Sequence, residues 1–318
     1  MTTAEVSIED VLLAAHRIAP YVHRTPVATS ATLDADLDCE VVFKAENLQK
    51  IGAFKARGAT NVVLSLPDEV AKRGVVTHSS GNHGQALAYA ARIRGIPSWI
   101  VMPRTASSVK IEAVRSYGAE IILCEHDERE AAAARIEAES GATLVHPYDD
   151  PMVIAGQGTA TLELIEDHGP FDVVVAPIGG GGLLSGMAVV ATGVDASPEI
   201  VGAEPEAVDD AYRSLLTGVR QPGVPDPRTL ADGLLTGIGE VPFAILRATG
   251  ATILTVSEAA ILEAARFLLF RLKLVVEPSG AVGLAALQTH RKRFIGKRVG
   301  VVLSGGNTDF AWLDSPSS

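Results

Sequence analysis

The sequence predicts an α/β protein with two open, mostly parallel sheets that carry helices on both faces. Short runs rich in β-branched residues alternate along the chain with longer amphipathic stretches, a pattern typical of parallel sheets covered by helices. The 318 residues are 47% hydrophobic and 20% charged, with a mean hydropathy of +0.24. Such a chain can bury a large core in about two domains.

Each strand is predicted from a short β-branched or apolar run, and each helix from an apolar stripe of helical period. The expected strands are 40–44, 74–77, 98–101, 120–123, 172–176, 199–204, 252–256 and 298–303. The expected helices are 84–94, 107–117, 128–140, 158–168 and 257–271. The uncharged stretch 173–194 contains Pro177 and four glycines, which suits a buried strand, loop and helix better than a membrane span.

Residues 74–145 alternate strand and helix and would form a small sheet by themselves. They predict a small domain, 73–149, inserted into a large domain made of 1–72 and 150–318. Open parallel sheets bind ligands at the carboxyl ends of their strands, so the loops there are where chemistry is expected.

Charge and motifs exclude several function classes. The net charge of −11 argues against a nucleic-acid partner. Two cysteines, no basic segment before the first apolar stretch and no membrane span predict a cytoplasmic protein without a membrane partner. The P-loop, G-x-S-x-G and H-E-x-x-H patterns are missing, and no G-x-G-x-x-G register can be completed at the glycine run.

The segment 46–59 places Lys55 directly after Phe54, in a turn of small residues that opens a helix. Partial enclosure there can lower the pKa of a lysine and present a neutral amine as a nucleophile. A surface lysine at a helix start is the alternative.

The segment 77–85 crowds serine, asparagine and histidine side chains into the turn before a helix. Backbone N–H groups at a helix N-terminus bind anions, although Ser and Asn are also ordinary helix caps.

The segment 177–183 holds four consecutive glycines after a strand, whose amides can wrap a phosphate. Ser304 follows the last strand, where a hydroxyl can donate to a ring nitrogen. Together, the four segments offer what an aldehyde cofactor with a phosphate and a pyridine ring requires.

From Arg24 to Asn307, the order and spacing of these motifs resemble the pyridoxal-phosphate-dependent serine/threonine dehydratase family of fold type II. Within it, the motifs are most similar to those of serine racemase and threo-3-hydroxyaspartate dehydratase. The resemblance implies pyridoxal 5′-phosphate as cofactor, a small amino acid as substrate and a homodimer.

The resemblance also assigns roles to residues. It implies that Lys55 forms the Schiff base to the cofactor and removes the substrate α-proton. The remaining cofactor contacts it implies are Phe54, Asn82, Gly179, Gly180, Gly181, Gly182, Leu183, Glu277 and Ser304. The substrate contacts it implies are Ser79, Ser80, Gly81, Asn82, His83, Arg129 and Thr236. A hydroxyl such as that of Ser304 leaves the ring a milder electron sink than a carboxylate would, which suits β-elimination.

Two of these residues bear on the reaction. Ser80 either returns a proton on the face opposite Lys55, as racemisation needs, or only binds carboxylate. Arg129 either meets a second substrate carboxylate or is a solvated residue of a charged helix start.

Glu204, Val208 and Asp210 resemble the family's site for a divalent cation, Mg²⁺, Ca²⁺ or Mn²⁺, with two carboxylates and a backbone carbonyl as hard oxygen ligands. An acidic loop before a helix is the alternative.

The expected activity is that of an ammonia-lyase, a dehydratase that performs β-elimination on L-serine, L-threonine or threo-3-hydroxyaspartate to give a 2-oxo acid and ammonia. Serine racemase with side dehydratase activity is one alternative. A non-catalytic amino-acid-binding protein on the same fold is another.

Overall fold

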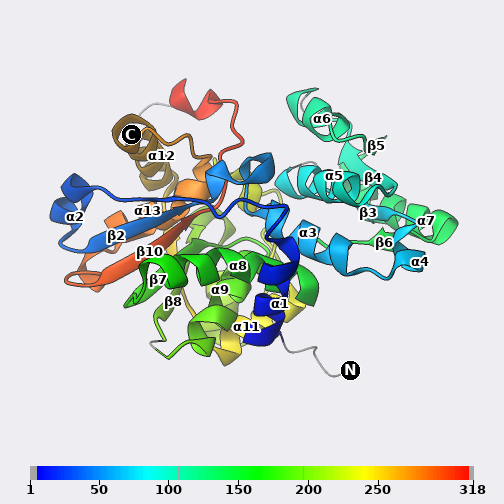
Figure 1. Cartoon of the computed structure of the whole chain (residues 1–318). Helices are drawn as coiled ribbons and strands as arrows, with labels where there is room; N and C mark the ends of the chain where they lie inside the picture. The colour runs from blue at the N-terminus through cyan, green and yellow to red at the C-terminus, as the bar shows by residue number, and fades with distance from the viewer. Residues whose placement is uncertain (1–5, 80, 107, 196, 315–318) are drawn as a thin grey trace.

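The computed structural model describes residues 6–79, 81–106, 108–195 and 197–314. It contains two separate sheets that lie side by side (Figure 1). The larger sheet has the strand order β1-β2-β10-β7-β8-β9. Its strands are β1 (Val27–Ala28), β2 (Glu40–Ala45), β7 (Val173–Pro177), β8 (Glu199–Pro205), β9 (Thr252–Val256) and β10 (Arg298–Leu303). All of its pairings are parallel except that of β1 with β2.

The smaller sheet has the order β5-β4-β3-β6 and is parallel throughout. Its strands are β3 (Val75–Thr77), β4 (Ser98–Pro103), β5 (Glu120–Cys124) and β6 (Thr143–Leu144). The predicted fold class is thereby confirmed, with two open sheets and the smaller one formed by a continuous insertion. The domain limits at 72/73 and 149/150 stay a prediction.

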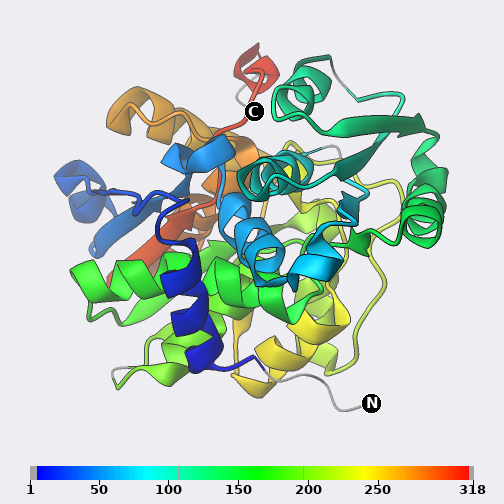
Figure 2. The same cartoon turned by 45° about the vertical axis from the view of Figure 1, so that its right-hand side comes forward.

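Helices cover both faces of each sheet (Figure 2). The α-helices are α1 (Ile8–Ile18), α2 (Ala31–Leu37), α3 (Lys55–Ser65), α4 (Asp68–Ala71), α5 (Asn82–Arg94), α6 (Ser108–Arg115), α7 (Arg129–Ser140), α8 (Pro151–His168), α9 (Gly182–Gly193), α10 (Asp210–Thr217), α11 (Glu240–Ala248), α12 (Glu258–Phe267) and α13 (Pro278–Thr289). Short 3₁₀ turns are η1 (Glu46–Leu48), η2 (Lys50–Gly52), η3 (His126–Glu128), η4 (Glu206–Val208), η5 (Asp232–Leu234), η7 (Arg291–Arg293) and η8 (Ala311–Asp314), and η6 (Leu268–Leu272) is a π-helical turn.

Alternation along the large-sheet strands divides the core into two layers. Val41 and Phe43 face α12 and α13, whereas Val42 of the same strand faces the layer built on α8 and α9. Both faces are therefore buried, which explains why these strands are nearly continuous apolar runs.

Helix α3 connects the two sheets. Its residues Ala59, Val62 and Val63 share one core with α5 and the small sheet, and Gly58 packs directly against Gly156 of α8. The helix that begins at Lys55 is thus packed on both sides.

Among the described residues, no helix has both the length and the apolar character that crossing a bilayer requires.

Candidate active site

The predicted loop motifs meet at the carboxyl edge of the large sheet. Ser304 directly follows β10, and the glycine run follows β7, its parallel neighbour. The Phe54 amide donates to the Ser304 carbonyl at 3.0 Å, and Ala53 forms an antiparallel bridge with Gly305. Segments about 250 residues apart in sequence are therefore joined into one layer of backbone.

Lys55 is the first residue of α3, and its amine donates to the Pro147 carbonyl at 2.7 Å. Its Nζ also lies 5.0 Å from the centroid of the Phe54 ring. Burial lowers the pKa of Lys55 from 10.5 to about 8, because an ammonium loses hydration there. Near neutral pH, a useful fraction of this amine is uncharged and nucleophilic.

Asn82 connects the small-sheet side of the molecule to the loops at the carboxyl ends of the large-sheet strands. It is the first residue of α5, and its Nδ2 donates to Glu277 Oε1 at 2.9 Å. Asn307 Nδ2 donates to Asn82 Oδ1 at 2.8 Å and to the Ile51 carbonyl at 2.7 Å. A line of hydrogen bonds thus crosses from one sheet to the other beside Ser304.

Glu277 is buried at the start of α13. Burial, with a smaller contribution from the Asp232 charge, raises the pKa of Glu277 to about 8. At neutral pH the carboxyl is therefore mostly protonated while it accepts from Asn82.

The glycine loop enters α9 at Gly182, with Gly181 in the left-handed region at φ 92°. A side chain on Gly180 would overlap the ring of Tyr148. The loop thus combines bare backbone with a helix N-terminus, the usual setting for a bound phosphate. Leu183, the next residue, is buried.

Tyr148, which packs against the glycine loop, is a residue that the sequence analysis missed. Its ring lies edge-on to His146 at 4.6 Å, and Thr236 is close enough to lower the pKa of its hydroxyl, which burial raises overall. His146 meets His78 in the same manner at 6.0 Å. Burial lowers the pKa of both histidines, so this aromatic row is uncharged at neutral pH. The signal available was the aromatic residue in a polar loop directly after β6.

The other predicted substrate residues gather at the start of α5. The Gly81 amide lies 3.4 Å from Ser79 Oγ, and among the described residues beyond its chain neighbours no atom lies within 4 Å of where a Gly81 side chain would begin. His83 is buried with Nε2 3.2 Å from the Val145 carbonyl, and burial keeps its pKa well below 6.5. Ser80 lies outside the described residues.

Arg129 and Thr236, the two remaining predicted substrate residues, lie on different elements. Arg129 begins α7, and its charge contributes to the lowered pKa of His78, the residue before Ser79. Thr236 is exposed, and it lies close enough to Tyr148 to act on the pKa of that hydroxyl.

The predicted cation ligands lie around η4. Glu204 and Asp210 are buried, and their carboxylates accept from the Tyr212 amide at 2.6 Å and the Ile238 amide at 2.8 Å. Burial raises the pKa of Asp210 and raises that of Glu204 to about 9. No cluster of three or more His, Cys, Asp or Glu side chains suited to a metal occurs in the described part of the chain. The cation site stays a prediction.

Residues 18–305 match the family model described as pyridoxal-phosphate dependent enzyme. The chain belongs to this family. It is 46% identical over 305 residues to a beta-hydroxyaspartate dehydratase of Paracoccus denitrificans, covering 95% of this chain and 96% of the relative. It is 45% identical to an L-threo-3-hydroxyaspartate ammonia-lyase of Saccharomyces cerevisiae, covering 94% and 93% of the two chains.

Among solved structures, the chain superposes on a serine racemase from Dictyostelium discoideum with a TM-score of 0.91. The two are 42% identical, and the match covers 96% of this chain and 99% of the other.

The site fits the family's cofactor in its chemistry. A partly desolvated lysine amine can condense with an aldehyde, a glycine cradle at a helix N-terminus can hold a phosphate, and a neutral hydroxyl at a strand end can meet a ring nitrogen.

Proposed function

We propose that the protein is a pyridoxal-phosphate-dependent ammonia-lyase that eliminates water from a β-hydroxy amino acid. The substrate class comprises L-serine, L-threonine and threo-3-hydroxyaspartate, and the product is a 2-oxo acid with ammonia. The observation that carries the proposal is the Lys55 amine, whose pKa is lowered to about 8 and which is held between Phe54 and the Pro147 carbonyl. The relatives named for hydroxyaspartate favour an acidic substrate.

Pyridoxal phosphate, when bound, supplies the electron sink that makes the α-proton of an amino acid acidic. The neutral amine of Lys55 takes that proton as the general base. The β-carbon–oxygen bond breaks, and the hydroxyl leaves as water with one proton, which balances the proton removed from the α-carbon. The enamine that remains hydrolyses to a 2-oxo acid and ammonia.

Other residues hold the reacting groups. The amides of Gly179 to Leu183 would bind the phosphate, and the Ser304 hydroxyl would face the ring nitrogen. The backbone and side chains of Ser79, Ser80, Gly81, Asn82 and His83 would bind the substrate carboxylate. Arg129 would suit a second carboxylate on the β-carbon.

Ammonia release should be measured on threo-3-hydroxyaspartate, L-serine, L-threonine and D-serine, with and without Mg²⁺. Activity on at least one β-hydroxy acid is expected, together with a visible absorption band that Lys55→Ala abolishes. Inactivity on all four would exclude this substrate class. A band that survives Lys55→Ala would exclude the assigned lysine.

Serine racemisation is the second candidate, supported by the similarity to a serine racemase structure. It needs an acid on the face opposite Lys55, and Ser80 is the residue proposed for it. Ser80→Ala should then suppress D-serine formation while elimination continues. If both reactions fall in parallel, Ser80 only binds carboxylate. A binding protein without catalysis is disfavoured by the lowered pKa of Lys55.

A divalent cation at Glu204, Val208 and Asp210 completes the proposal. Two buried carboxylates near one loop would be stabilised by Mg²⁺, Ca²⁺ or Mn²⁺. Mg²⁺ should raise the melting temperature of the wild type and leave that of Asp210→Asn unchanged. An equal rise in both proteins would place the cation elsewhere. We further propose that the protein is a cytoplasmic homodimer. Light scattering would measure its mass in solution.

A further inference from the structure

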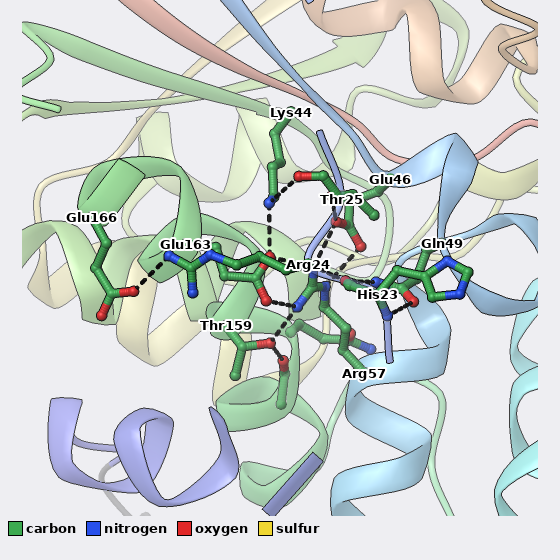
Figure 3. Close-up of polar contacts among 12 residues, drawn as sticks. His23, Arg24, Thr25, Lys44, Glu46, Gln49, Arg57, Thr159, Glu163 and Glu166 are labelled. Carbon is green, nitrogen blue, oxygen red and sulfur yellow. Dashed lines mark hydrogen bonds and ion pairs between the residues drawn. The ribbon is translucent and has the colours of Figure 1, made fainter. Parts of the chain in front are cut away.

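A buried cluster of charged side chains (Figure 3) includes both ends of the segment 46–57, which carries Lys55. It consists of Lys44 on β2, Glu46 in η1, Arg57 in the first turn of α3 and Glu163 on α8, here called the ion cluster. Arg57 and Glu46 have no exposed side-chain surface. The two positive and two negative charges balance, so the cluster can remain ionised away from water.

Arg57 is the centre of the ion cluster. Its Nε and Nη2 donate to the two Glu46 oxygens at 2.7 and 2.8 Å, and its Nη1 and Nη2 donate to the two Glu163 oxygens at 2.7 and 2.8 Å. Nη1 also donates to Thr159, and Nη2 to the His23 carbonyl. Two carboxylates are thus each bound by a planar fork, a geometry that a lysine cannot reproduce.

The other members hold the two carboxylates in place. Lys44 donates to Glu163 at 2.7 Å, and the Thr25 hydroxyl donates to Glu46 Oε1 at 2.5 Å. Burial alone would raise the pKa of Glu46, yet the charge of Arg57 and its hydrogen bonds lower it overall. Glu46 is therefore a fixed anion rather than a titrating group at neutral pH.

The position of the ion cluster indicates a role other than stabilising the fold. Burying ion pairs is a costly way to stabilise a fold, since apolar side chains of similar size often serve as well. The Arg57–Glu46 fork instead joins the two ends of the segment 46–57, which contains Phe54 and Lys55. Within that segment Ile51 has φ 59°, a left-handed conformation costly for a β-branched residue. Such a segment needs both ends fixed to keep one shape.

We propose that Arg57 and Glu46 are positioning residues that hold Lys55 at the geometry needed to condense with the cofactor. The inference rests on the proposed role of Lys55. If the fork is loosened, the first turn of α3 gains freedom and the amine gains water. Its reactivity in the apoprotein should then change before any cofactor is present.

The test uses Arg57→Lys and, in case that protein does not fold, Glu46→Gln, which removes one charge and one acceptor. The apoprotein is acetylated with acetic anhydride across a pH series, and modification of Lys55 is followed by peptide mass spectrometry. In both variants, the pH at which Lys55 is half-maximally acetylated should rise by about one unit, towards the pKa of a hydrated amine. Both should also weaken binding of pyridoxal phosphate about tenfold or more.

Arg293→Lys is the matched control, because Arg293 bridges Glu199 and Thr252 at a distant edge of the large sheet. It should lower the melting temperature without moving the Lys55 midpoint. If the cluster variants lose only melting temperature, as this control does, the ion cluster merely stabilises the fold and the proposal is wrong. Failure of the wild type to bind pyridoxal phosphate would instead overturn the proposed function.

Discussion

Lys55 shows how one residue acquires chemistry from its surroundings. The only cause of its lowered pKa is desolvation, and its single described hydrogen bond is to a neutral carbonyl, at Pro147. Within the described part of the chain no charge contributes to this lowered pKa, so the reactivity of the amine depends on how well water is kept away. This makes the residue sensitive to small displacements of α3.

The rate at which the apoprotein takes up pyridoxal phosphate should therefore rise with pH through a midpoint near 8. Protonated Lys55 cannot attack an aldehyde, and deprotonation becomes complete above that midpoint. Stopped-flow absorbance from pH 6 to 10 measures the profile. Glu277→Gln is the control, because Glu277 titrates in the same range. A midpoint that vanishes in this variant would assign the profile to Glu277.

Local pattern was a good guide to the strands at the element scale. The strands predicted at 252–256 and 298–303 have the predicted limits, since β-branched runs of this length have few alternatives. Helix α8 begins at Pro151, well before the predicted 158, with Asp150 as its cap. Its apolar residues have no clear helical period because nearly all of its first fourteen positions are buried. Helix α13 was missed for the same reason.

Contacts between residues far apart in the chain could not be predicted from the sequence. The motif residues Lys55, Asn82 and Ser304 could be found because each lies in a distinctive short pattern. The contacts of Tyr148 and of the ion cluster could not, since the paired residues of the cluster lie 11 to 119 residues apart and depend on which loops the two sheets bring together. Packing, rather than local propensity, decides such contacts.

The close packing of the glycine loop against Tyr148 predicts that the loop tolerates no side chain at Gly180. Gly180→Ala would place a methyl group against the Tyr148 ring, so either the loop or the ring must move. Affinity for pyridoxal phosphate, measured by fluorescence titration, should fall about tenfold or more. The double variant Gly180→Ala/Tyr148→Ala removes the overlap and should recover part of that loss. Unchanged affinity in the single variant would show that the loop does not bind the phosphate in this conformation.

At the scale of the whole molecule, the site depends on how the two sheets face each other. Asn82 contributes a hydrogen bond from α5 to Glu277, and Lys110 of α6 forms an ion pair with Asp232 of η5 at 2.9 Å. The charges of both Lys110 and Asp232 also act on the pKa of Glu277, so this pair lies near that residue. Both side chains are partly exposed, and such a pair adds only about 0.2–1 kcal/mol.

Because it spans the two sheets, this pair should affect substrate binding more than stability. Lys110→Met should raise KM by up to about fivefold, with a nearly unchanged melting temperature, since 1 kcal/mol corresponds to that ratio. About 1 M salt, where the screening length is about 3 Å, should raise the wild-type KM similarly. Lys72→Met, which breaks an exposed pair with Glu69 at helix α4, is the control and should leave KM unchanged. Equal effects of the two substitutions would mean that the loss of a surface charge, and not the link between the sheets, controls binding.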